Sequence, residues 1–96
     1  MNQFFDRLGE DWVEAAQRRG AKIAKPELDS RVALELLELA RVAAHTQERR
    51  FAPLASYLAG VAAERLRSAT PDLDEAATAA FIEEVRKKLE REVPGL

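Results

Sequence analysis

The chain contains no cysteine, and its 96 residues include a single histidine. Without cysteine the sequence offers no disulfide, no thiolate nucleophile and no cysteine ligand for zinc. One histidine would have to serve every Ser-His-Asp scheme, and no serine stands in a Gly-x-Ser-x-Gly turn. A glycine-rich phosphate loop, a His-x-x-x-His pair and an aspartate-rich calcium loop are also missing. We therefore expect no enzymatic activity and no bound cofactor.

Long apolar runs are missing too, because none approaches the roughly 18 residues that a membrane-spanning helix needs. The first six residues have neither the basic region nor the apolar region of a signal peptide. With 15 Lys and Arg against 17 Asp and Glu, the formal net charge is -2. This balance removes the general electrostatic attraction on which non-specific nucleic-acid binding depends. We expect a cytoplasmic protein without a membrane or nucleic-acid partner.

What the sequence has in abundance is helical periodicity. Apolar residues recur at helical spacing over residues 4–20, and Gly20 is suited to the left-handed position that ends a helix. Gly9 lies inside this pattern and costs up to about 1 kcal/mol relative to alanine, so we expect looser first turns. Residues 21–28 contain Pro26 and no sustained period, which predicts a linker.

The chain is organised around two apolar helices within residues 30–67. The first runs to about residue 47 and is apolar over more than half of its circumference, which predicts a central helix covered on several sides. The second is expected to begin at Pro53, because proline fits the first turn of a helix. Its apolar stripe comprises Leu54, Tyr57, Leu58, Val61, Ala62 and Leu66. We expect close approach of a neighbouring backbone at Gly60, and therefore a tightly packed hairpin.

A last helix is expected after the turn at residues 70–72, with Asp72 and Glu75 at the spacing of a capping box. Its predicted inner face comprises Leu73, Ala77, Ala80, Phe81, Val85 and Leu89, and residues 93–96 end it. The sequence thus predicts an all-α protein, a single domain over residues 1–96. The predicted architecture is a four-helix bundle with a central hairpin, in which the last helix covers one side and the first helix the other.

The candidate site is the corner between the two central helices. His45 lies near a helix end, Arg49 and Arg50 lie in the turn, and the first amides after Pro53 are expected to be free. Such a group could bind an anion such as phosphate, or a partner protein. The alternative is that His45 caps the helix through its carbonyls, that the arginines are solvated, and that Phe51 fills the hairpin.

A polar strip leads to this corner and adds Glu38 and Arg41 to the candidate residues. It runs along the first central helix in steps of three and four residues, through Arg31, Glu35, Glu38, Arg41, His45 and Glu48. Glutamates and a histidine on one face can ligate a metal, but the interleaved arginines favour a lattice of surface ion pairs. We therefore expect no metal site. Leu34 and Val42 interrupt the strip and indicate that part of it is covered.

Three segments together resemble a known family: LLELARVAAH at residues 36–45, ERRFAPL at residues 48–54 and YLAGVA at residues 57–62. They are similar to a small bacterial helical domain of unknown function. That domain is found alone or fused to nucleotidyltransferases that resemble the molybdenum cofactor guanylyltransferase. The resemblance covers about residues 28–66. The family's usual turn has Pro or Lys after the arginine, where this chain has Phe51 after Arg50.

The resemblance implies an accessory domain associated with cofactor nucleotidyl transfer, whose partner is a nucleotidyltransferase-like protein. It places His45, Arg49 or Arg50, Pro53 and Gly60 at recurring family positions. Two other classes stay open. A homo-oligomeric module, for example a homodimer, could pack through the small residues Ala55, Ala59 and Ala63. A DNA-binding helix is disfavoured, because residues 53–66 carry only two charged side chains.

Overall fold

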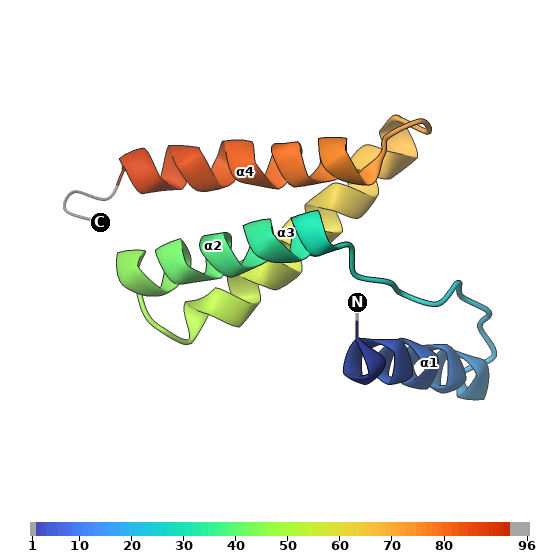
Figure 1. Cartoon of the computed structure of the whole chain (residues 1–96). Coiled ribbons are helices and arrows are strands. Elements are labelled where there is room, and N and C mark those ends of the chain that lie inside the picture. Colours follow the sequence, from blue (N-terminus) through green and yellow to red (C-terminus); the bar gives the residue numbers. More distant parts are fainter. Residues whose placement is uncertain (1, 93–96) are drawn as a thin grey trace. The chain divides into compact units, whose positions relative to one another are not determined.

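The computed structural model describes residues 2–92, which form four helices and no strand (Figure 1). The helices are α1 (Gln3–Arg18), α2 (Ser30–Thr46), α3 (Phe51–Ala69) and α4 (Glu75–Arg91). The predicted all-α class is therefore confirmed. The predicted end of the last helix at residues 93–96 lies outside the described residues.

Two compact units make up the chain, Met1–Ser30 and Arg31–Leu96. The first contains α1 and the segment after it, and the second contains α2, α3 and α4. The expectations that residues 1–96 form a single domain and that the first helix covers the hairpin stay predictions.

In the first unit, side-chain and backbone hydrogen bonds close both ends of α1. The Asn2 side chain accepts a hydrogen bond from the Phe5 amide at 3.2 Å, which satisfies one unpaired donor of the first turn. At the other end the amides of Gly20 and Ala21 donate to the carbonyls of Gln17 and Ala16, both at 2.9 Å. Gly20 has the left-handed φ of 78° that this cap requires. The prediction for this helix end is confirmed.

The segment after α1 folds back along the helix rather than acting as a plain linker. A Cβ atom on Gly9 would lie 2.7 Å from the carbonyl oxygen of Pro26, so only glycine fits there without a shift. Lys25 Nζ lies 3.6 Å from Asp6 Oδ1 and adds an ion pair between segment and helix. The reason for Gly9 is therefore a close backbone approach, which periodicity alone did not indicate.

In the second unit, α2 and α4 run in the same direction, and α3 runs the opposite way and crosses them obliquely (Figure 1). The buried cluster comes from α2 and α4, and α3 packs against it with small residues. It comprises Val32, Leu39, Ala79 and Ile82, with Leu36, Ala55, Ala59 and Leu89 packed around it. The predicted packing of the second and third helices with each other and with the fourth is confirmed.

The apolar stripe of α3 is only partly buried. The large residues of the predicted stripe are mostly exposed, with Leu54 at 61%, Tyr57 at 73% and Leu58 at 68%. The small residues face inward instead, and Ala63 is 5% exposed. Small side chains let the backbone of α3 approach both neighbouring helices, which large side chains would prevent. Ala55 and Ala59 pack on the core of their own unit, so this face is largely used within the chain. The homo-oligomeric alternative stays a prediction.

The explanation predicted for Gly60 was also wrong, because a Cβ atom there would meet nothing within 4 Å. α4 differs from the prediction as well. Its cap is Asp74, whose Oδ1 accepts from the Ala77 amide at 2.8 Å, and not Asp72. The buried residues of α4 are Thr78, Ala79 and Ile82, whereas Ala80 and Val85 of the predicted face are exposed.

Candidate functional site

The corner between α2 and α3 places its predicted polar residues at the surface. His45 lies in the last turn of α2 and is exposed, as are Arg49 and Arg50 in the turn. Arg50 Nε lies 3.2 Å from Glu48 Oε1. Within residues 2–92 the side chains of His45 and Arg49 form no hydrogen bond or ion pair. The structure therefore gathers these residues at one turn without joining them into a network.

The backbone of the corner differs from the sequence-based expectation in two ways. α3 begins at Phe51, so Pro53 is its third residue and is exposed. The amides of Phe51 and Ala52 donate to the carbonyls of Glu48 at 3.0 Å and Arg49 at 3.2 Å. At the end of α2, the Thr46 hydroxyl donates to the Val42 carbonyl at 2.6 Å, so Thr46 rather than His45 serves this carbonyl.

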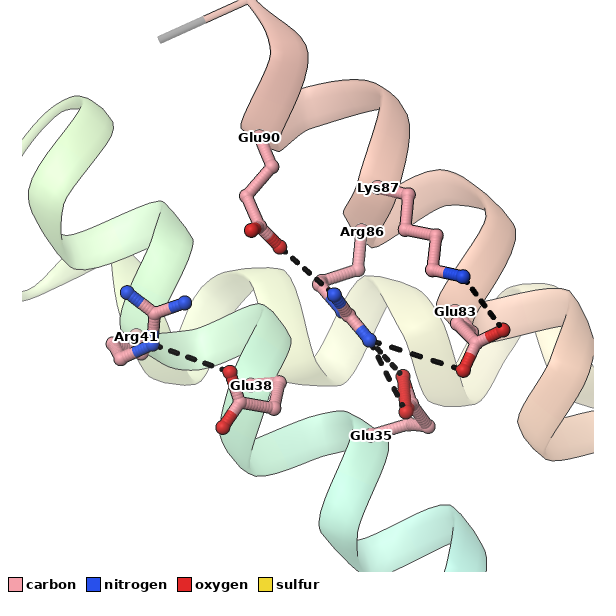
Figure 2. A network of polar contacts seen from close by, with 7 residues as sticks. All are labelled: Glu35, Glu38, Arg41, Glu83, Arg86, Lys87 and Glu90. Carbon is pink, nitrogen blue, oxygen red and sulfur yellow. Dashed lines mark hydrogen bonds and ion pairs between the residues drawn. The ribbon is translucent and has the colours of Figure 1, made fainter. Parts of the chain in front are cut away.

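Glu38 and Arg41, the other two candidate residues, pair with each other. Arg41 Nε donates to Glu38 Oε2 at 3.2 Å, one turn apart on α2 (Figure 2). No group of three His, Cys, Asp or Glu side chains that could hold a metal ion is found within the described residues. The binding role predicted for these residues and for the corner stays a prediction.

A more developed polar cluster joins α2 to α4 around Arg86 (Figure 2). The Arg86 guanidinium reaches Glu35 of α2 at 3.1 Å and 3.3 Å, and Glu90 of its own helix at 2.9 Å. Glu83 lies 3.9 Å from it on the preceding turn. The Arg86 and Glu35 side chains are only 15% and 13% exposed, so water screens this pair far less than a surface pair. We call Arg86, Glu35, Glu83 and Glu90 the Arg86 cluster.

Within the Arg86 cluster, electrostatics favour the charged forms of Arg86 and Glu90. The hydrogen bond from Arg86 lowers the pKa of Glu90 below its ordinary value, and burial opposes this change. The hydrogen bond to Glu90 likewise raises the pKa of Arg86 against the effect of burial, with Glu35 adding in the same direction. Arg86 Nε is buried without a hydrogen-bond partner within the described residues. The cluster thus joins α2 and α4 through charged side chains, and Arg86 Nε is its unsatisfied donor.

Sequence analysis placed Glu35 on an exposed strip and did not single out Arg86. One signal was available, since Leu34 and Val42 interrupt that strip. Val42 is fully buried in the structure, at 0% exposure, whereas Leu34 is 61% exposed. A helix covering Val42 must also cover part of the strip, and arginine can lay its stem on an apolar surface while its head meets a carboxylate. The sequence did not show which residue of α4 faces Glu35, because the face of α4 was misassigned.

An apolar groove lies between α3 and α4. The corner between α2 and α3 lies at one end of this groove. It consists of two hollows of about 270 Å³ and 380 Å³ that share Ala55 and Leu58 in their lining. Phe81 and Val85 of α4 border the first hollow. Phe51, Leu54 and Leu89 border the second, which Thr46 and Gln47 of the corner complete. Leu54 and Leu58 of α3 thus line a groove together and are not scattered singly over the surface.

Comparison with known proteins gives a family but no activity. A model of the family described as a domain of unknown function, DUF6457, matches residues 6–94. No curated protein and no solved structure matches the chain. Within residues 2–92, none of the helices combines the length and the apolar character needed to cross a membrane.

Proposed function

Because the chain belongs to the DUF6457 family, whose function is unknown, we propose its role from the surface: a non-enzymatic accessory domain that binds a protein partner. The observation that carries this proposal is the apolar groove between α3 and α4. Leu54 and Leu58 border it while more than half exposed, at 61% and 68%. Exposing such side chains together in a concave surface is costly in water and is typical of protein-binding sites.

The partner in this proposal is a nucleotidyltransferase that resembles the molybdenum cofactor guanylyltransferase. Support for it comes from the resemblance of residues 36–62 to domains found fused to such enzymes. The same proposal gives the corner a part in binding, because Thr46, Gln47 and Phe51 belong to the lining of the groove. His45, Arg49 and Arg50 would then contact the partner at the edge. The cytoplasmic location expected from the sequence belongs to this proposal.

Titration of the isotope-labelled chain with the nucleotidyltransferase, followed by amide-resolved NMR, tests the proposal. GTP with magnesium forms a parallel arm. We expect the nucleotidyltransferase to shift or broaden the amide resonances of residues 45–58 and of Val85. GTP with magnesium alone should leave these resonances unchanged. Shifts caused by the nucleotide alone would instead make the corner an anion site.

Two variants of matched exposure locate the binding surface. Leu58→Gln alters a groove residue that is 68% exposed, and Leu37→Gln alters a residue that is 69% exposed but borders neither hollow. Neither change removes a buried side chain, so both variants should fold. We expect Leu58→Gln to weaken partner binding at least about tenfold, since a hydrophobic anchor at the centre of an interface is worth more than 1 kcal/mol. Equal effects of the two variants would rule out the groove.

A further inference from the structure

α4 is held in two different ways along its length. Its first half is fixed by burial, since Thr78, Ala79 and Ile82 are its buried residues. It is also tied to α3 by Arg67, whose guanidinium lies 3.0 Å from Glu75 Oε1. Residues 83–92, in contrast, are all either exposed or only partly buried. The second half must therefore be held by something other than a packed core.

Hollows flank this second half on two sides. Leu89 packs against the core, but it also borders the 380 Å³ hollow of the groove. Another hollow, of about 350 Å³, lies on the other side of this half and is not part of the groove. It is bordered by Arg86, Lys87, Glu90 and Arg91. Side chains beside such hollows have fewer neighbours and gain less dispersion energy than core residues. Apolar packing therefore stabilises residues 83–92 less than it stabilises residues 75–82.

Besides the packing of Leu89, this half of α4 contacts α2 through the ion pair between Arg86 and Glu35 (Figure 2). Both Glu35 oxygens accept from Arg86 Nη2, and the two side chains are only 13% and 15% exposed. We propose that this pair is a latch: it holds the second half of α4 against α2, and its loss lets residues 83–92 move away while residues 75–82 stay packed.

The latch has a consequence for the groove. Val85 and Leu89 form part of the groove wall and lie on either side of Arg86 in sequence. Movement of this half would widen the groove along Leu58 and Leu54. That consequence rests on the proposed function, whereas the latch itself is a property of the chain without a partner.

Amide hydrogen exchange of the full chain, resolved by residue, tests the latch. In Glu35→Gln and in Arg86→Met, we expect the amides of residues 85–91 to exchange about tenfold faster or more, because local opening limits their exchange. The amides of residues 78–82 should keep their protection, which also shows that each variant folds. The double variant should exchange no faster than the faster single variant, since both changes break one contact.

Lys87→Met is the matched control, because Lys87 pairs with Glu83 at 3.3 Å on the same helix and makes no ion pair to α2. It should leave the exchange of residues 85–91 within a factor of about two. Uniform acceleration over all of α4 would overturn the latch and make the pair a contribution to global stability. Unchanged exchange in Arg86→Met would overturn it as well. Neither result depends on whether a partner binds the groove.

Discussion

The reason why a given residue occupies its position is often visible only in the three-dimensional structure, and the glycines are the clearest case. Gly9 and Gly60 both interrupt helical patterns, and sequence analysis assigned a loosening effect to the first and a close approach to the second. The structure reverses both, because Pro26 crosses Gly9 and nothing lies near Gly60. The helical period gives the face on which a glycine lies, but it does not show which backbone from elsewhere in the chain crosses that face.

Gly60→Ala tests this reversal. A methyl group at position 60 meets no atom within 4 Å and removes backbone freedom from the unfolded chain. We expect the free energy of unfolding in urea to rise by about 0.5 to 1 kcal/mol. Gly9→Ala is the comparison: its Cβ would lie 2.7 Å from Pro26 oxygen, so protection of α1 amides from exchange should fall. A loss of stability in Gly60→Ala would show that something approaches this face in solution.

Among the helices, α3 shows that a hydrophobic pattern does not determine which face of a helix is buried. Two apolar faces run along it, one of large residues and one of alanines, and either satisfies the helical period. The sequence pattern alone does not show which of the two faces is buried. The structure buries the alanines, since three helices that cross obliquely need small residues where they approach. The helices themselves were predictable from local signals, whereas the choice of face depends on helices distant in sequence.

Paired substitutions on α3 measure which face is inside. Ala63 is 5% exposed, so Ala63→Leu must push neighbouring atoms aside, and we expect it to destabilise the protein by about 1 to 3 kcal/mol. Leu58→Ala removes a side chain that is mostly in water, and we expect a change of at most about 0.5 kcal/mol. Urea unfolding of both variants provides the values. The opposite order would mean that the large residues of α3, and not its alanines, face the core.

The contact between Arg86 and Glu90 on α4 should make stability depend on pH in acid. The pKa of Glu90 is lower in the folded chain than its ordinary value of 4.5, because of Arg86 first and then of Arg41 and Lys87. The unfolded chain then binds more protons than the folded chain as pH falls below that value. Stability from this carboxylate is present above the ordinary pKa and is lost as pH falls through the folded pKa.

Urea unfolding measured from pH 7 to pH 3 tests this dependence. We expect Glu90→Gln to flatten the loss of unfolding free energy below about pH 4.5, the ordinary value for this group. Glu84→Gln is the control, because Glu84 forms no ion pair within the described residues. Identical slopes in the two variants would exclude a role of Glu90 in acid stability.

For the whole molecule, the division into units gives the last prediction. Every residue of the buried cluster belongs to the second unit, from Val32 to Ile82. Three helices with a shared core and more than 60 residues are at the lower size at which domains fold alone. We therefore expect a fragment of residues 28–96, which keeps the start of α2, to be helical by circular dichroism and to unfold cooperatively in urea.

A core substitution in this fragment shows whether it keeps the same interior. Ile82 is 4% exposed, and Ile82→Ala should lower the unfolding free energy by about 2 to 5 kcal/mol through lost burial and the cavity left behind. Because a small domain has only about 5 to 10 kcal/mol of stability, this change should strongly lower the urea midpoint. A fragment that unfolds without cooperativity, or one insensitive to Ile82→Ala, would mean that residues 1–27 are needed for the core of α2, α3 and α4 to form.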